Sequence, residues 1–284
     1  MSEALNLPIA LPDGTTLQAR YWPSADAKAT ALIVHGLGEH QARYAEVVDV
    51  LRESGLAVAT YDHRGHGRSE GKRGDLPDAD TLLRDLALVI DTVRAASPVR
   101  PFLLLGHSMG GIVAARFVGG ALETPRPTWS RPVDALVLSS PALDAGLRPL
   151  QKLLVSVMGR LAPHTAAGNG LPPEWVSRDP AVVAAYRADP LVHDRITATL
   201  AGFFGKAIAA VQALAPRWRT PTLLMWAGAD RCVAPAGSAR FAKAAPADVV
   251  TAREFPGLYH ELFNEPEKDE VFAVLREWLV QRFG

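Results

Sequence analysis

The sequence contains a single cysteine, carries no net charge and has no long apolar run, and each of these absences excludes a class of protein. Cys232 cannot form an internal disulfide, which is compatible with a reducing compartment. Thirty Lys and Arg residues balance 30 Asp and Glu residues, so there is no basic field and we predict no nucleic-acid partner. No apolar run approaches the length of a membrane span, and residues 1–5 lack the basic and apolar regions of a signal peptide. We therefore expect a soluble, cytoplasmic protein.

What the sequence does contain is a regular alternation of short apolar runs with helical patterns, in a length that suits one large α/β domain. Apolar runs typical of buried strands cover residues 31–34, 57–61, 102–105, 135–139, 222–226 and 250–255. Helical patterns cover residues 44–54, 81–96, 109–122, 237–245 and 268–282. Helical crossovers between buried strands indicate parallel pairing. Residues 5–10 and 16–21 flank Pro12-Asp13-Gly14 and predict an antiparallel hairpin at one edge of a mostly parallel sheet.

The alternation stops between residues 143 and 216, where prolines separate helical pieces and there is no strand-like run. Because this segment lies between two predicted strands, we predict an inserted helical cap at 143–216 on a core formed by 1–142 and 217–284. Six apolar residues of the cap recur at helical spacing: Leu150, Leu153, Leu154, Val157, Met158 and Leu161. We expect most of this stripe to pack on the core, while an outward-facing part would give a transient contact with membrane or micelle surfaces.

A serine lies at the tip of a predicted strand-to-helix turn, in Gly106-His107-Ser108-Met109-Gly110. The flanking strand and helix are the context of a nucleophile elbow, in contrast to a chance Gly-x-Ser-x-Gly. The two glycines let the strand end and the helix start pack closely around a strained serine backbone. A serine hydroxyl is a weak nucleophile, so the prediction requires a base, an acid and oxyanion donors nearby.

The base and the acid are expected at the carboxyl ends of other strands. His260 follows the last predicted strand and is the only histidine after the candidate acid, which fits the chain order serine, acid, histidine. Asp230 follows the strand at 222–226 and is the preferred acid. Asp248 is the alternative, but it precedes its strand and so belongs at the opposite end of the sheet.

Backbone amides near the serine would stabilise the negative oxygen of a tetrahedral intermediate. The Met109 N–H is next to the candidate nucleophile. The loop after the strand at 31–34, His35-Gly36-Leu37-Gly38-Glu39-His40, contains glycines that let backbone approach a substrate. The Leu37 N–H is therefore the expected second donor.

A metal site is an alternative use of the polar residues near these loops. The residues concerned are His35, His40, Asp62, His63 and His66. His63 and His66 lie in a turn and not at i and i+4 on a helix, and no set of cysteines accompanies them. We therefore expect no metal, and we assign these histidines, with Arg64, to hydrogen bonds in the loops behind the site.

Several motifs together carry a resemblance to a known family. They are His35-Gly36-x-Gly38-Glu39-His40-x-x-Arg43-Tyr44, Asp62-x-x-Gly65-His66-Gly67-x-Ser69-Glu70-Gly71, Gly106-His107-Ser108-Met109-Gly110-Gly111, Ala229-Asp230-Arg231 and Tyr259-His260. The chain resembles the α/β-hydrolase fold and, within it, the monoacylglycerol lipase and lysophospholipase-like family. The resemblance implies a mostly parallel central sheet flanked by helices, with an inserted cap and no cofactor. It also implies Ser108, Asp230 and His260 as a catalytic triad, and Leu37 and Met109 as the oxyanion hole.

The cap matches this family more loosely, through Asp179-Pro180, Tyr186 and Asp189-Pro190-Leu191. The resemblance implies Arg43 and Tyr186 as substrate-binding residues. Family members can place a glutamate upstream of this tyrosine to hold the glycerol hydroxyls, and this chain has Val182 there. This departure concerns glycerol recognition and not ester hydrolysis.

The sequence therefore predicts a serine carboxylester hydrolase that cleaves monoacylglycerols or similar single-chain esters through an acyl-enzyme. A generic esterase or a lysophospholipase would use the same residues. A peptidase or amidase would need an acidic pair for the substrate's α-amino group, for which the cap offers scattered candidates such as Glu174 and Asp179. A ligand-binding protein without catalysis usually lacks a triad member, and none is missing here. Acyl length, head group and oligomeric state stay open at this point.

Overall fold

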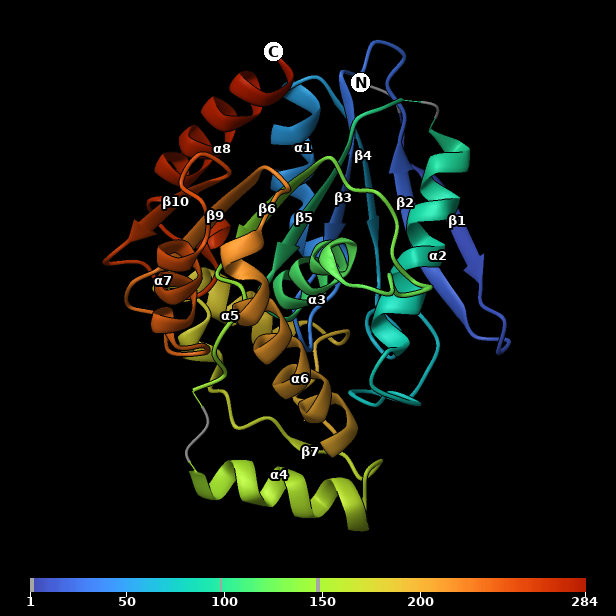
Figure 1. Ribbon diagram of the computed structural model, residues 1–284, viewed down its shortest axis with the longest axis vertical. Helices are drawn as coiled ribbons and strands as arrows, with labels where there is room; N and C mark the ends of the chain where they lie inside the picture. The colour runs from blue at the N-terminus through green and yellow to red at the C-terminus, as the bar shows by residue number, and fades with distance from the viewer. Residues whose placement is uncertain (1–2, 98, 147–148) are drawn as a thin grey trace.

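One large sheet forms the centre of the molecule (Figure 1). The computed structural model describes residues 3–97, 99–146 and 149–284. The sheet has eight strands in the order β1-β2-β4-β3-β5-β6-β9-β10. They are β1 Leu5–Ala10, β2 Thr16–Trp22, β3 Ala29–Val34, β4 Leu56–Tyr61, β5 Phe102–His107, β6 Ala135–Ser139, β9 Thr222–Ala227 and β10 Val250–Phe255. Strand β2 is antiparallel to both neighbours and the pairs from β4 to β10 are parallel, so the predicted hairpin and mostly parallel sheet are confirmed.

Helices cover both faces of this sheet. The α-helices are α1 Ala45–Glu53, α2 Thr81–Ala96, α3 Ser108–Gly119, α4 Pro149–Leu161, α5 Pro180–Ala188, α6 Ala198–Leu214, α7 Pro235–Ala244 and α8 Lys268–Phe283. The 3-10 helices are η1 Gln41–Tyr44, η2 Gly120–Leu122, η3 Pro173–Trp175, η4 Ala215–Arg217 and η5 Leu262–Asn264. Buried residues of α2, α3 and α6 join one face of the sheet in one hydrophobic cluster, and those of α1 and α8 join the other face. The five helices predicted in the core are confirmed to within a few residues at their ends.

The central strands end side by side at one edge of the sheet. Every residue of β3, β5 and β6 is buried, as their continuous apolar sequences predict. The parallel register pairs Val34 with Gly106 and His107 with Ser139. The loops that follow these strands therefore start next to one another, and side chains from distant parts of the sequence can meet there.

Between β6 and β9 the chain forms the inserted helical cap, and Figure 1 shows α4 at its far end from the sheet. The expectation that this segment contains no strand is wrong, because β7 Ala167–Gly168 and β8 Arg195–Ile196 form an antiparallel pair. Each of these strands has only two residues, so neither can show the alternation that identifies a strand in a sequence. The boundaries of the cap at residues 143 and 216 stay predictions.

Helix α6 continues into η4, and the resulting helix Ala198–Arg217 is long and apolar enough, by length and composition, to cross a membrane. The expectation that no apolar stretch approaches this length is therefore wrong for this segment, in which Lys206 and Gln212 interrupt the apolar run. Of its apolar window, 33% is buried inside the structure. Phe203 and Val211 belong to the same hydrophobic cluster as α3, so this helix ties the cap to the core.

Candidate active site

Ser108 is the first residue of α3 and directly follows β5. Its φ of 52° lies in the left-handed region, which is unusual for a residue other than glycine and must be held by the surrounding structure. A Cβ atom at Gly110 would stand 1.9 Å from the carbonyl oxygen of Val34, so only glycine lets α3 approach β3 this closely. Ser108 thus lies on the tight strand-to-helix turn that the sequence predicts.

The structure brings together Ser108, at the start of α3, and Asp230 and His260, from the loops after β9 and β10. The Oγ of Ser108 lies 2.8 Å from Nε2 of His260, whose Nδ1 lies 2.7 Å from one carboxylate oxygen of Asp230. The other oxygen of Asp230 accepts the backbone N–H groups of Cys232 and Val233, at 2.8 and 3.1 Å. Both oxygens of the carboxylate are therefore engaged, and the imidazole is held with Nε2 toward the serine. This arrangement can carry the serine proton to the imidazole.

Asp248, the alternative acid, lies at the other end of β10. It is exposed and occupies the turn that precedes this strand. Asp230 and His260 follow the carboxyl ends of β9 and β10, where Ser108 also lies. Asp230, and not Asp248, therefore lies at the same end of the sheet as Ser108 and His260.

Two opposing effects set the charge state of His260. Burial lowers the pKa of this imidazole, but the charge and hydrogen bond of the Asp230 carboxylate raise it, and the resulting pKa lies above the ordinary value of 6.5. The ring of His107 packs against His260 with centroids 4.8 Å apart. Burial, together with the nearby His260, lowers the pKa of His107 to about 4. His107 is therefore neutral at neutral pH and does not repel a proton on His260.

Both predicted oxyanion donors lie at this serine. Met109 is in the first turn of α3, where backbone N–H groups have no acceptor within the helix and the helix dipole favours negative charge. Leu37 belongs to the loop after β3, in which the Gly36 N–H donates to the Glu39 carboxylate at 2.5 Å. In the part of the chain that the structure describes, we consider two cavities that reach Ser108, and Leu37 and Met109 line the larger one.

That larger cavity, which we call the apolar chamber, has a volume of about 360 Å³. Residues from both the core and the cap line it, among them Leu37, Met109, Met158, Ile196, Phe204 and Val233. Among the described residues, no charged side chain lines it. The chamber can therefore bury a hydrocarbon chain without leaving a charge unpaired.

The predicted apolar stripe of the cap divides between inside and outside. Met158 lines the apolar chamber. Leu153, Val157 and Leu161 are 60%, 41% and 78% exposed, and their spacing of four residues places them on one face of α4. The side chains of Leu150 and Leu154 lie outside the described residues.

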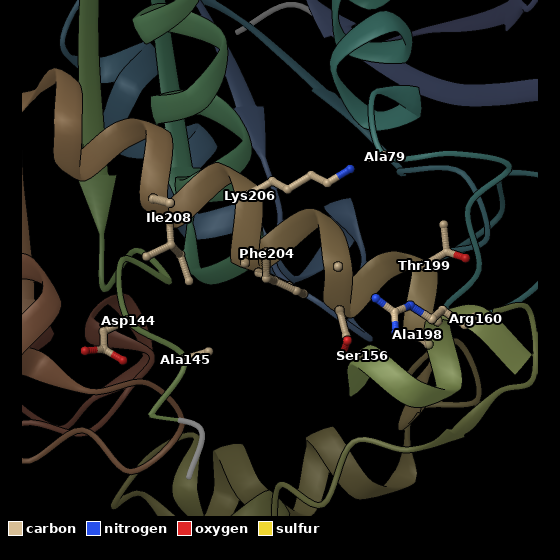
Figure 2. A pocket seen from close by; sticks show the side chains of 15 residues that line it. Ala79, Asp144, Ala145, Ser156, Arg160, Ala198, Thr199, Phe204, Lys206 and Ile208 are labelled. Atoms are coloured by element: carbon tan, nitrogen blue, oxygen red, sulfur yellow. The ribbon is translucent and has the colours of Figure 1, made fainter. Parts of the chain in front are cut away.

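A wider cavity of about 1020 Å³ lies between α4 and α6 (Figure 2). We call it the outer cavity. Figure 2 shows Phe204 and Ile208 pointing into it from α6. Phe204 also lines the apolar chamber, as do Ala145, Ala198 and Ala201. The two spaces are therefore neighbours, with Phe204 at their junction.

The second cavity at Ser108, the small chamber, has a volume of about 40 Å³ and is lined by Tyr186. The guanidinium of Arg43 lies 4.8 Å from the centroid of the Tyr186 ring. Arg43 also donates to the carboxylates of Glu39 and Glu261, at 2.6 to 2.8 Å. Tyr186 thus lies at the site as expected, whereas Arg43 lies behind it in a network of ion pairs.

Sequence reasoning missed several residues that line these chambers. Asn169 and Leu171 line both chambers, and so does Cys232. Glu261 lines the small chamber beside His260. Glu261 and Cys232 carried a signal, because Glu261 directly follows the candidate base and Cys232 lies two residues after the candidate acid. Asn169 and Leu171 lie in the cap, far from every motif, and only the folded chain brings them to Ser108.

The histidines behind the site hydrogen-bond to loop backbone. The ring of His35 accepts the His63 N–H at 2.9 Å, and its other nitrogen lies 2.7 Å from the Gly36 carbonyl oxygen. Burial lowers the pKa values of His35, His63 and His66, so these rings are neutral at neutral pH. In the described part of the chain, the one group of three potential metal ligands within 4.8 Å consists of Asp230, Cys232 and His260. Two of its members are already paired with each other.

This chain is similar over most of its length to one protein family and to several lipases. Residues 25–267 match the model of the family described as serine aminopeptidase, S33. The monoacylglycerol lipase of Mycolicibacterium smegmatis is 36% identical over 261 residues, covering 91% of this chain and 90% of that protein. The monoglyceride lipase of Rattus norvegicus is 32% identical over 279 residues, covering 96% and 89%. The crystal structure of Paleococcus ferrophilus monoacylglycerol lipase has a TM-score of 0.80 at 31% identity, covering 99% of this chain and 100% of that one.

Proposed function

Because this chain belongs to the serine hydrolase family described as serine aminopeptidase, S33, we propose that it hydrolyses monoacylglycerols and similar single-chain carboxylic esters. The observation that carries this proposal is the chain of hydrogen bonds from Ser108, which lines the apolar chamber, through His260 to Asp230. The named lipases to which the chain is similar support the same class of substrate.

The reaction follows from the positions of these groups. Neutral His260 accepts the proton of Ser108 as the serine oxygen attacks the ester carbonyl. The N–H groups of Leu37 and Met109 stabilise the resulting oxyanion. The carbon–oxygen bond to the alcohol then breaks, and His260 returns the proton to the departing alcohol. Water, activated by the same imidazole, releases the fatty acid from Ser108.

The apolar chamber is proposed to hold the acyl chain. Each methylene that is buried there contributes about 0.8 kcal/mol, so affinity should rise with chain length until the chain meets a wall. Phe204 stands where the chamber meets the outer cavity, and a longer chain would have to pass it. This residue is therefore the expected limit on acyl length.

The small chamber is proposed to hold the alcohol, with Tyr186 in contact with it and Arg43 acting through Tyr186. Glu39 and Glu261 line this chamber, so a phosphate group would meet two carboxylates that share a single arginine. A neutral alcohol such as glycerol avoids this repulsion, which favours monoacylglycerols over lysophospholipids. Val182 is not among the described lining residues, so discrimination between glycerol and other neutral alcohols should be modest.

An aminopeptidase would need carboxylate oxygens free to bind an ammonium group. The oxygens of Glu39 accept from Gly36, Tyr44 and Arg43, and those of Glu261 accept from Arg43 and Asn264. The cap acids are also engaged. Glu174 pairs with Arg187, and Asp179 accepts the Ala181 N–H at the start of α5. The observations therefore favour an ester over a peptide with a free amino end.

We also propose that the protein is soluble in the cytoplasm and meets its lipid substrate at a membrane or micelle surface through the exposed face of α4. Leu153, Val157 and Leu161 form this face. It belongs to the helix that contributes Met158 to the apolar chamber, so a lipid bound there would be close to this chamber. Contact through three side chains would be transient.

A substrate panel combined with active-site labelling tests this function. Monoacylglycerols should be turned over faster than lysophospholipids of the same acyl length, and aminoacyl anilides should be poor substrates. A fluorophosphonate should add once, at Ser108, and Ser108→Ala should lose both labelling and turnover. If aminoacyl anilides were turned over faster than every ester, the proposed lipase activity would be wrong and a peptidase activity would take its place.

A further inference from the structure

Two residues of the cap hold the loop that contains Leu37. The carboxylate of Asp189, just beyond the end of α5, lies 2.8 Å from Nε2 of His40, which is 5% exposed. Its second oxygen accepts the Leu191 N–H at 2.8 Å. Asp189 is therefore fixed at both oxygens, and it connects the cap to the core at the end of the loop at 36–40.

A backbone contact lies two residues from His40. The His193 N–H donates to the Gly38 carbonyl oxygen at 2.9 Å. The φ of Gly38 is +76°, and a Cβ atom there would stand 2.1 Å from the His193 carbonyl oxygen. The cap backbone therefore lies directly on this loop, with no room for a side chain between them.

The His193 ring extends this contact beneath the loop. It packs on His66 with centroids 4.7 Å apart, and His66 lies 5.4 Å from His35. His35 in turn contacts the Gly36 carbonyl oxygen. The residues on both sides of Leu37 are thus held, Gly36 by the core residues His35 and Glu39, and Gly38 by the cap.

We infer that the cap segment at 189–193 positions the oxyanion donor, with Asp189 and His193 acting as positioning residues for the Leu37 N–H. This inference rests on the proposed function. A donor stabilises an oxyanion only when it is held close to the position that the oxygen will occupy, so an anchor on either side of Leu37 affects the chemical step. The cap is then part of the catalytic machinery in addition to lining the route of the acyl chain.

The alternative is that these contacts only attach the cap. Removing them would then impair the binding of long acyl chains and raise KM, while leaving the turnover of an acetyl ester unchanged. A positioning role predicts a lower kcat for both substrates, because the oxyanion is common to them and an acetyl group is too short to use the cap. A comparison of kcat and KM for a short and a long ester therefore distinguishes the two roles.

The test compares Asp189→Ala and Asp189→Asn with Asp179→Ala, which alters an acid at the other end of α5 that caps the helix. For nitrophenyl acetate and nitrophenyl decanoate, Asp189→Ala should lower kcat by the same factor, roughly tenfold to a hundredfold, with KM within about twofold. Binding of a trifluoromethyl ketone, which forms an oxyanion at the serine, should weaken by that factor. Asp189→Asn keeps the size of the side chain and should lose less. Asp179→Ala should keep the wild-type kcat on both esters.

Thermal melting establishes that each variant is folded. If Asp189→Ala does not fold, the comparison is made with Asp189→Asn in its place. Wild-type kcat in a folded Asp189→Ala, or a loss restricted to decanoate, would overturn the inference. Ser108→Ala separates this outcome from failure of the proposed function. Residual turnover in that variant would overturn the proposed chemistry itself, whatever Asp189 does.

Discussion

His107 packs against His260, and the surroundings of the two rings move their pKa values in opposite directions. Burial lowers the pKa of His107 to about 4, whereas the Asp230 carboxylate outweighs burial at His260 and raises its pKa. One imidazole is thus kept neutral beside another that gains and loses a proton in the proposed reaction. This pair leads to two predictions about pH, one for activity and one for stability.

The first prediction concerns the pH dependence of kcat/KM. Only neutral His260 can accept the Ser108 proton, and its pKa lies above 6.5, so kcat/KM should rise with pH through a midpoint above 6.5. Initial rates on a soluble nitrophenyl ester between pH 5 and 9 measure it. A midpoint below pH 6 would contradict the assignment of His260 as the base.

The second prediction concerns stability in acid. The unfolded chain protonates His107 and His193 near pH 6.5, but the folded protein does so only near pH 4, because burial lowers the pKa of both to about 4. His107 should therefore reduce the free energy of unfolding by about 1.4 kcal/mol for each pH unit between 6.5 and 4, and the partly exposed His193 should reduce it by less, because solvent screens its surroundings. Urea denaturation at pH 7.5, 6 and 5 measures the slope, and His107→Asn should decrease it. Equal stability at all three pH values would contradict the prediction.

The third prediction is that Asp230→Asn lowers kcat by on the order of 10⁴-fold while the protein stays folded. One oxygen of Asp230 accepts two backbone N–H groups, so the amide oxygen of Asn takes that position and turns its NH₂ toward His260. The imidazole is then held in the wrong tautomer. Steady-state kinetics and thermal melting measure the effect, and Asp248→Asn is the matched control at the other end of β10. If the kcat of Asp230→Asn stayed within tenfold of wild type, a residue other than Asp230 would be the catalytic acid.

The fourth prediction concerns Phe204. Phe204→Ala should open the apolar chamber into the outer cavity and raise kcat/KM for palmitoyl relative to decanoyl esters. Each additional buried methylene is worth about 0.8 kcal/mol, so the ratio should change roughly fourfold for each methylene that passes Phe204. Ile208→Ala is the control, because Ile208 lines only the outer cavity. An unchanged ratio in Phe204→Ala would mean that the acyl chain does not pass this residue.

The fifth prediction concerns the exposed face of α4. Replacing Leu153 and Leu161 together by serine should weaken binding to phosphatidylcholine vesicles, because a fully buried leucine contributes about 1.5–3 kcal/mol. Turnover of soluble nitrophenyl acetate should stay at the wild-type rate. Val280→Ser is the control, since Val280 is 67% exposed and lies on α8, far from α4 in Figure 1. Vesicle sedimentation measures the binding. Equal binding by the wild type, the double variant and Val280→Ser would mean that α4 does not contact the membrane.

Local patterns in the sequence were enough to predict the sheet, the hairpin and the positions of Ser108, Asp230 and His260. A buried parallel strand is a continuous apolar run, and a nucleophile elbow needs glycine at fixed positions around the serine, so both are visible over a few residues. The two-residue strands β7 and β8 were missed because pairing so short depends on backbone contact and not on a side-chain pattern.

The contacts around these residues depend on long-range packing. Arg43 meets Glu261 across 218 positions of sequence, and His40 meets Asp189 across 149, so no local pattern could reveal either pair. The motif residue Arg43 suggested contact with substrate, but its guanidinium is engaged by carboxylates behind Tyr186. Residue types and local spacing along the chain were enough to identify the groups that we propose to carry the chemistry. Packing of the cap on the core decided the size of the chambers and the support of each group, because long-range contacts exist only in the folded protein.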